Sequence, residues 1–295
     1  MLNRVTNLTM SASAQRTLQT QQSRLAALQE KASSLDKISR PSDDPAATGQ
    51  ALQTRSRLAA SAQYGRNIDD GGNWLTAADS ALGQATNVLG KIRDLTVQAG
   101  NGALNQPAKD AIAIELEGLG KDMLSIANTQ HLGRNIFAGS SDAAGAFAPG
   151  NPPVFNGIPG STVERRISDN QTVRVDADGA KIFGDGASSV FKLVNDMATA
   201  LRAGTDISPR LAEVDSAFKA VINGRAEIGT RQAQLERAGN VNTELEATLD
   251  AQKMGIEKAD LGSVIMDLKL QETNYQVALA ATARVLQPTL MDFLR

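Results

Sequence analysis

The sequence predicts a mainly α protein: an elongated helical rod, a terminal layer in which the N- and C-terminal helices form a coiled coil, and a small β-rich insert domain. Three observations favour this fold class. Aromatic residues make up only 3% of the 295 residues although 41% are hydrophobic, which is typical of long helices with aliphatic seams. Apolar residues recur at helical spacing at both ends of the chain. A stretch near the middle of the sequence, at 131–186, is rich in Gly, Pro, Asn, Asp and Ser.

The last forty residues carry a long apolar stripe. Its members follow one another mostly at steps of three, four or seven, which places them on one side of a helix. They are Leu261, Ile265, Leu268, Tyr275, Leu279, Leu286 and Leu290. A lone amphipathic helix is marginal in water. We therefore expect a second helix, from this chain or from another molecule, to cover the stripe.

The N-terminal segment provides a matching stripe. Heptad spacing relates Leu18, Gln21, Leu25, Leu28, Ala32 and Leu35. We predict that the two ends pair with each other, and that the pair forms an assembly interface with neighbouring molecules. The ends are then expected to become fully ordered only on assembly.

A short connector follows the first helix at about 36–44. Pro41 and Pro45 disfavour helical geometry in the residues before them, and Asp43 and Asp44 are residue types that cap helices. We interpret the segment as the end of one helix and the start of the next, and not as a metal or catalytic site. The connector motif comprises Arg40, Pro41, Asp43, Asp44 and Pro45.

The rest of the chain is organised around this pair of ends. Helical spacing covers about 45–99, 107–129, 187–203, 208–254 and 263–288. A break or kink is expected at Gly71–Gly72. The alternation of Val173, Val175 and Ala177 predicts a β-hairpin that turns at Asp178–Gly179 and resumes at Ile182.

These elements divide the chain into five expected segments. Two helical ends enclose two halves of a helical rod, and the β-rich insert lies between the halves. The segments are 1–44, the N-terminal coiled-coil helix and connector; 45–140, the first half of the rod; 141–186, the insert; 187–255, the second half of the rod; and 256–295, the C-terminal coiled-coil helix.

The residues offer little for catalysis or for ligand binding. The chain has no cysteine, so disulfides and thiolate sites are excluded. Its one histidine, His131, is interpreted as an ordinary polar residue. No phosphate-binding loop or nucleophile elbow occurs, and we predict no enzyme activity, cofactor or metal. A net charge of −2 gives no reason to expect nucleic-acid binding, and no apolar run suits a membrane span or a cleavable signal peptide.

Several longer motifs carry a family resemblance. They are ISRPSDDPAATGQAL at 38–52, YGRNIDDGGNWLTAADSAL at 64–82, IRDLTVQAGNG at 92–102, IANTQHLGRNIFAGS at 126–140 and LQPTLMDFLR at 286–295. In these motifs the chain resembles the flagellin family of bacterial flagellar axial proteins, over roughly 1–140 and 190–295. Pro45 after two aspartates is most similar to the form found in the subunits that join hook to filament.

The resemblance implies a structural, extracellular role in bacterial motility. It implies a subunit at the hook–filament junction, with other copies of itself in a ring, a hook-associated protein on the hook side and flagellin on the filament side. It also implies export by the flagellar type III system without a cleaved signal, and a flagellar export chaperone as partner. Two alternatives stay open: a flagellin that forms the filament itself, and a soluble coiled-coil adaptor.

Overall fold

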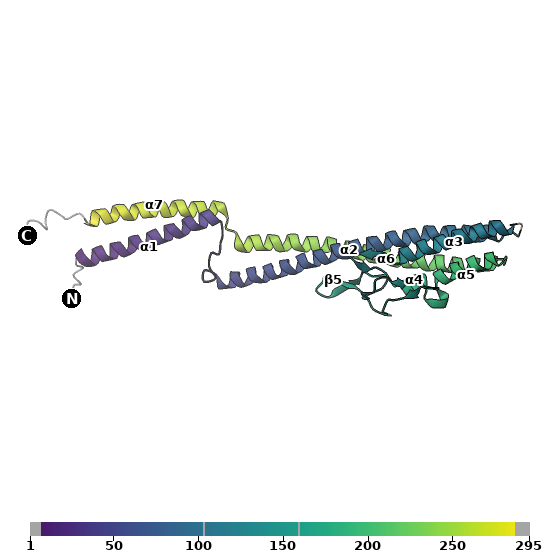
Figure 1. Cartoon of the computed structure of the whole chain (residues 1–295). Coiled ribbons are helices and arrows are strands. Elements are labelled where there is room, and N and C mark those ends of the chain that lie inside the picture. Colours follow the sequence, from purple (N-terminus) through teal and green to yellow (C-terminus); the bar gives the residue numbers. More distant parts are fainter. Residues whose placement is uncertain (1–6, 103, 159, 287–295) are drawn as a thin grey trace, which may run out of the picture. The chain divides into compact units, whose positions relative to one another are not determined.

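The computed structural model describes residues 7–102, 104–158 and 160–286, and is mainly helical (Figure 1). The helices of this part are α1 (Asn7–Ser34), α2 (Pro45–Ala99), α3 (Gln106–Ala127), α4 (Gly179–Phe183), α5 (Val190–Arg202), α6 (Leu211–Glu257) and α7 (Leu261–Leu286), with 3₁₀ turns at Gly186–Ser188 and Ser208–Arg210. They belong to two compact units. The terminal unit comprises Met1–Ala59 and Glu246–Arg295, and the central unit comprises Ala60–Leu245, so α2 and α6 contribute to both.

In the central unit α2 and α6 run antiparallel. Ion pairs join Asp79 to Arg225 at 2.7 Å and Arg93 to Asp215 at 2.8 Å. The residue numbers of the α6 partners therefore decrease as those of α2 increase, which shows that the helices are antiparallel. Buried residues recur every seven positions on both helices, the repeat of helices that coil around each other. On α2 these are Ser61, Ile68, Leu75, Leu82 and Leu89, and on α6 they are Val214, Val221, Ile228, Leu235 and Asn242.

Helices α3 and α5 complete the helical part of the central unit by packing against each other. Asn105 caps α3 by accepting a hydrogen bond from the Ala108 amide, and Ser189 caps α5 through the Lys192 amide. The strong amphipathic pattern of α5 is buried along one side, at Val190, Phe191, Leu193, Val194, Met197, Ala198 and Leu201. The predictions of helices at about 107–129 and 187–203 are confirmed to within a few residues.

The β-rich insert begins at about 130, earlier than the expected start at 141, and its described residues form three two-stranded antiparallel sheets. They are β1 (Gln130–His131) with β2 (Arg134–Asn135), β3 (Phe147–Ala148) with β4 (Val154–Phe155), and β5 (Glu164–Ser168) with β6 (Gln171–Arg174). An aromatic cluster fills its interior, because Phe147 lies with its ring centroid 4.9 Å from Phe191 and 5.2 Å from Phe155. Small sheets of this length cannot bury a core alone, so the insert depends on the helices beside it.

The predicted hairpin through Asp178–Gly179 is wrong. The strands that pair are β5 and β6, and Ser168 lies opposite Gln171 where the hairpin turns. At the predicted turn the Asp178 carboxylate instead accepts a hydrogen bond from the Lys181 amide at 3.1 Å and caps the short helix α4. Asp-Gly suits a helix N-terminus as well as a type I′ turn, and Ile182 is buried as a helical residue, not as a strand residue.

The predicted break at Gly71–Gly72 is also wrong, because α2 is one helix from Pro45 to Ala99. Gly71 serves close packing. A Cβ atom at this position would lie 3.0 Å from Val175 Cγ1 and 3.2 Å from Leu235 Cδ1. The insert and α6 therefore approach α2 where it has no side chain. In the described residues, no helix is both long enough and apolar enough to cross a lipid bilayer.

Gly224 on α6 permits a similar approach and yields a first prediction. A Cβ atom there would lie 2.8 Å from two carbons of Ile182, whereas one at Gly229 would meet nothing within 4 Å. Gly229→Ala should raise the free energy of unfolding by about 0.5–1 kcal/mol, because alanine favours the helix. The free energy of unfolding of Gly224→Ala should be lower than that of Gly229→Ala by about 1–3 kcal/mol, because overpacking at Gly224 destabilises the fold by this amount.

Urea unfolding followed by the fluorescence of Trp74 measures both variants, because this residue is the chain's one tryptophan and is buried in the central unit. Equal stability of the two variants would contradict the close contact between α4 and α6.

Candidate assembly surface

The terminal unit is built on an antiparallel pair of helices, α1 and α7 (Figure 1). The backbone carbonyl of Leu35, just after α1, accepts a hydrogen bond from the Ala259 amide, just before α7, and Gln21 meets Gln271 further along. Half-buried or buried residues follow steps of four and three on both helices. On α1 they are Ala14, Leu18, Gln21, Leu25, Leu28 and Ala32, and on α7 they are Val264, Leu268, Gln271, Tyr275, Ala278 and Thr282.

The predicted C-terminal stripe divides between two faces of α7. Leu268 and Tyr275 belong to the seam with α1, whereas Leu261, Ile265 and Leu279 are 50%, 46% and 43% exposed. The side chain of Leu286, the last residue of α7, is not described, and Leu290 lies outside the described residues. On the N-terminal side Leu18, Leu25 and Leu28 lie in the seam, while Leu35 follows the end of α1 with a φ of +56°.

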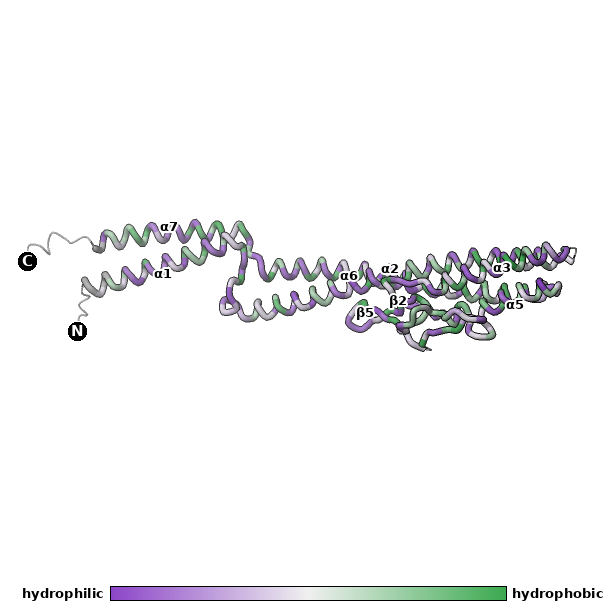
Figure 2. Tube along the Cα trace, viewed as in Figure 1, coloured by the Kyte–Doolittle hydropathy of each residue, from purple (hydrophilic) through white to green (hydrophobic). Residues whose placement is uncertain are grey.

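The exposed residues extend into an outward apolar face of α7. We define this face by two strips of α7: Leu261, Ile265 and Leu279 border the seam, and Met266, Leu270 and Val277 lie roughly 140° further round the helix, all six between 43% and 74% exposed. Green apolar residues appear along α7 in Figure 2, alternating with polar ones. Sequence reasoning missed Met266, Leu270 and Val277, although steps of four and seven relate them. A helix that keeps so many large apolar side chains in water is suited to contact a further surface.

The two connectors of the terminal unit bind each other beside the seam. The Lys37 amide donates to the Glu257 carbonyl at 2.7 Å, and Lys258 Nζ pairs with Asp36 Oδ1 at 2.8 Å. Arg55 on α2 donates to the Glu257 carboxylate at 2.7 Å. We call these contacts the connector clasp. They join residues more than 200 positions apart in the sequence.

The predicted connector motif lies next to this clasp. Asp44 accepts a hydrogen bond from the Ala47 amide at 2.9 Å, so its interpretation as a cap of α2 is confirmed. Asp43 accepts from the Arg40 amide at 2.8 Å and closes the turn before α2. Pro41 and Pro45 are exposed, with Pro45 as the first residue of α2. The motif therefore shapes the chain locally, while residues on either side of it make the clasp.

The charges of the clasp stabilise each other. The hydrogen bond from Arg55, with the charge of that guanidinium, lowers the pKa of Glu257 below its usual 4.5, although partial burial opposes the shift. The same hydrogen bond raises the pKa of Arg55. A carboxylate whose pKa is lowered in the fold stabilises it above the usual pKa, and this stabilisation is lost as the pH falls through the lowered value.

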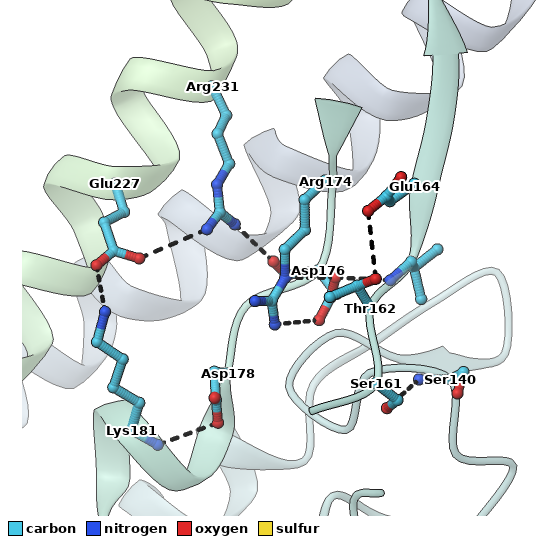
Figure 3. Close-up of polar contacts among 11 residues, drawn as sticks. Ser140, Ser161, Thr162, Glu164, Arg174, Asp176, Asp178, Lys181, Glu227 and Arg231 are labelled. Carbon is cyan, nitrogen blue, oxygen red and sulfur yellow. Dashed lines mark hydrogen bonds and ion pairs between the residues drawn. The ribbon is translucent and has the colours of Figure 1, made fainter. Parts of the chain in front are cut away.

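A second polar cluster joins the insert to α6 in the central unit (Figure 3). The Asp176 side chain is fully buried; it pairs with Arg174 and accepts a hydrogen bond from the Val163 amide at 2.7 Å. Arg231 donates to the Asp176 carbonyl at 2.7 Å, and the Glu227 carboxylate pairs with both Arg231 and Lys181. A cavity of about 200 Å³ lies beside them. Because the acids already bind the bases, we interpret this cluster as an anchor of the insert and not as a ligand site.

His131 lies in strand β1. Its ring centroid is 5.6 Å from that of Trp74, the buried indole of α2, and Arg165 lies over the same indole. The imidazole therefore packs in the insert–helix contact. Within the described residues, no group of three or more His, Asp or Glu side chains is arranged to hold a metal ion.

This geometry defines a class of protein: a long helical protein whose first and last described helices pair and leave large apolar side chains exposed. The comparisons with known proteins agree with that class. Residues 5–142 match the bacterial flagellin N-terminal helical region, and residues 211–294 match the bacterial flagellin C-terminal helical region. The chain belongs to the flagellin family and is a structural component of the bacterial flagellum.

Individual relatives cover most of the chain. The flagellar hook-associated protein 3 of Salmonella typhimurium is 25% identical, over 85% of this chain and 87% of its own. The flagellin of Bacillus subtilis is 27% identical, over 88% of each chain. The crystal structure of hook-associated protein 3 from Legionella pneumophila has a similar fold, with a TM-score of 0.63, 16% identity and coverage of 68% of this chain and 97% of that one.

The clasp gives a second prediction, which concerns pH. Because its pKa is lowered, Glu257 should keep its charge and its contact with Arg55 at and above its usual pKa of 4.5, and lose both as the pH falls further, through the lowered pKa. Hydrogen exchange at the Lys37 and Ala259 amides, corrected for the intrinsic rate, should speed up over this range.

The matched variant is Arg55→Gln, which removes the cause of the shift. It should exchange faster than the parent at pH 6 and change less between pH 6 and 3. Exchange that is independent of pH in the parent would contradict the role of Glu257.

Proposed function

We propose that this protein is the subunit that joins the flagellar hook to the flagellin filament. Its copies would form a ring, in contact with a hook-associated protein on one side and with flagellin on the other. The observation that supports this most directly is the similarity to hook-associated protein 3 of Salmonella typhimurium, which runs through most of both chains. Pro45 in the SRPSDDPAA segment supports the same choice within the family.

Assembly in this proposal uses the outward face of α7. Leu261, Ile265 and Leu279 would be covered by neighbouring subunits, while Leu18, Leu25, Leu28, Leu268 and Tyr275 hold the terminal helices together. Burial of a fully exposed leucine side chain contributes about 1.5–3 kcal/mol. These side chains are already partly buried, so each would contribute a fraction of that free energy to a subunit contact. Leu286 and Leu290 are proposed to extend this interface.

The route to the cell exterior is proposed from the family. Export through the flagellar type III system would deliver the chain without a cleaved signal peptide. Before assembly, an export chaperone would cover the exposed side of the C-terminal helix, where apolar side chains otherwise face water. The connector residues Arg40, Pro41, Asp43, Asp44 and Pro45 would set the start of α2 beside the clasp.

Deletion of the gene tests the function. The junction role predicts hooks without filaments and flagellin released into the medium. Loss of filaments with no filament protein secreted would instead identify this chain as a flagellin. Normal filaments would overturn both and favour a coiled-coil adaptor.

The outward face is tested by a substitution series on α7. In a complemented deletion strain, Ile265→Asp and Leu279→Asp should reduce the number of filaments at least tenfold, because each places a charge in the proposed contact. Asn274→Asp, at an exposed polar position on the opposite side of the same helix from Ile265 and Leu279, is the matched control and should assemble normally. Circular dichroism should show unchanged helix content in all three purified proteins.

Leu268→Asp separates the two faces, because Leu268 lies in the seam. It should lower the helix content of the terminal unit as well as assembly. Normal filaments from Ile265→Asp and Leu279→Asp would show that this face is not the interface.

A further inference from the structure

A polar layer interrupts the apolar seam between α1 and α7. Gln271 Nε2 donates a hydrogen bond to the backbone carbonyl of Gln21 at 3.2 Å and another to the Gln21 side-chain carbonyl. Both glutamines occupy seam positions and are half-buried. The heptad steps place Leu25 level with Leu268 on one side of this layer and Leu18 level with Tyr275 on the other.

We propose that the Gln21–Gln271 layer determines the register of the terminal helix pair, and so fixes where along α1 the outward face of α7 is presented. This inference does not depend on the junction role. A polar pair at a seam position is a known means of specifying register in coiled coils, at some cost in stability.

The apolar layers alone specify the register poorly. If α7 slips by seven residues towards one end, Leu25 meets Tyr275 and Leu28 meets Gln271; in the other direction Leu18 meets Leu268. Some apolar contacts therefore remain after such a slip: Leu25 with Tyr275 in one direction, and Leu18 with Leu268 in the other. The polar layer does not remain, because Gln21 would face Val264 or Ala278 and its hydrogen bonds with Gln271 would be lost. Amides left facing apolar side chains disfavour the slipped pairings.

The central unit contains a second layer of the same kind. Ser61 and Asn242 lie in the heptad series of α2 and α6, where they are 1% and 8% exposed. Ser61 Oγ donates to Asn242 Oδ1 at 2.7 Å, and Asn242 Nδ2 donates to the Ser61 carbonyl at 3.2 Å. The packed insert and α3 also hold α2 and α6 in place. Among the described residues, no other element covers the α1–α7 seam in this way. Its polar layer should therefore have a larger effect on the register of the helix pair.

The connector clasp is the competing explanation, because it also fixes one end of the pair. A slip of seven residues moves α7 by about 10 Å, which would break the Leu35–Ala259 hydrogen bond and separate Asp36 from Lys258. The test therefore uses the full-length chain with the clasp weakened by Asp36→Ala and Lys258→Ala, and compares the parent glutamines with Gln21→Leu and Gln271→Leu in that background.

Disulfide trapping reads the register, because the chain has no cysteine of its own. Leu25→Cys with Leu268→Cys reports the native register, and Leu25→Cys with Tyr275→Cys reports a shift of seven residues. In the native register the second pair is about 10 Å apart along the axis, beyond the roughly 7 Å that a disulfide can span between Cα atoms.

With both glutamines present, the shifted pair should form at less than about one tenth of the yield of the native pair. With two leucines the ratio of shifted to native cross-link should rise at least tenfold, while circular dichroism shows unchanged helix content. An equal ratio with glutamine and with leucine would overturn the proposal and assign the register to the other contacts. Loss of both cross-links with a fall in helix content would overturn it too, because the amides would then be needed for pairing itself.

Discussion

The structure depends on pairing between segments from opposite ends of the sequence. In the terminal unit α1 meets α7, and in the central unit α2 meets α6, in both cases antiparallel and with a seven-residue repeat. Each pair must bring together residues between about 120 and 250 positions apart. Closing such long loops has an entropic cost that grows only slowly with their length. Long, repetitive apolar seams can therefore offset it, and they leave the intervening chain free to form the insert.

The helices could be predicted from the sequence because their signals are local or strictly periodic. Apolar residues at helical spacing predicted α2, and Asp44 with Pro45 predicted its first turn. The hairpin prediction failed at Asp178–Gly179, where the same two residues suit a cap. Only the position of the insert against α6 decides between them. Gly71 was misread for a related reason: a glycine that admits Val175 and Leu235 looks, in sequence, like one that breaks a helix.

The candidate surface was predictable only in part. The sequence shows that α7 is apolar, but not which apolar residues face α1, because the stripe is wider than one seam. The structure assigns Leu268 and Tyr275 to the seam and leaves Ile265 and Leu279 exposed. The clasp gave no local signal, since Asp36, Arg55 and Glu257 are ordinary charged residues until the fold brings them together. Contacts between residues so far apart require the three-dimensional arrangement.

The residues of the connector clasp are synthesised at different times during translation, because they are far apart in the sequence. A ribosome releases the N-terminal part of a chain first, so α1 appears well before its partner α7, and Asp36 appears 222 residues before Lys258. Throughout that interval the leucines of α1 have no intramolecular helix to cover them. The terminal unit is therefore the last part of the molecule that can form. A newly made chain passes through a period in which its N-terminal helix is open to any other apolar surface in the cell.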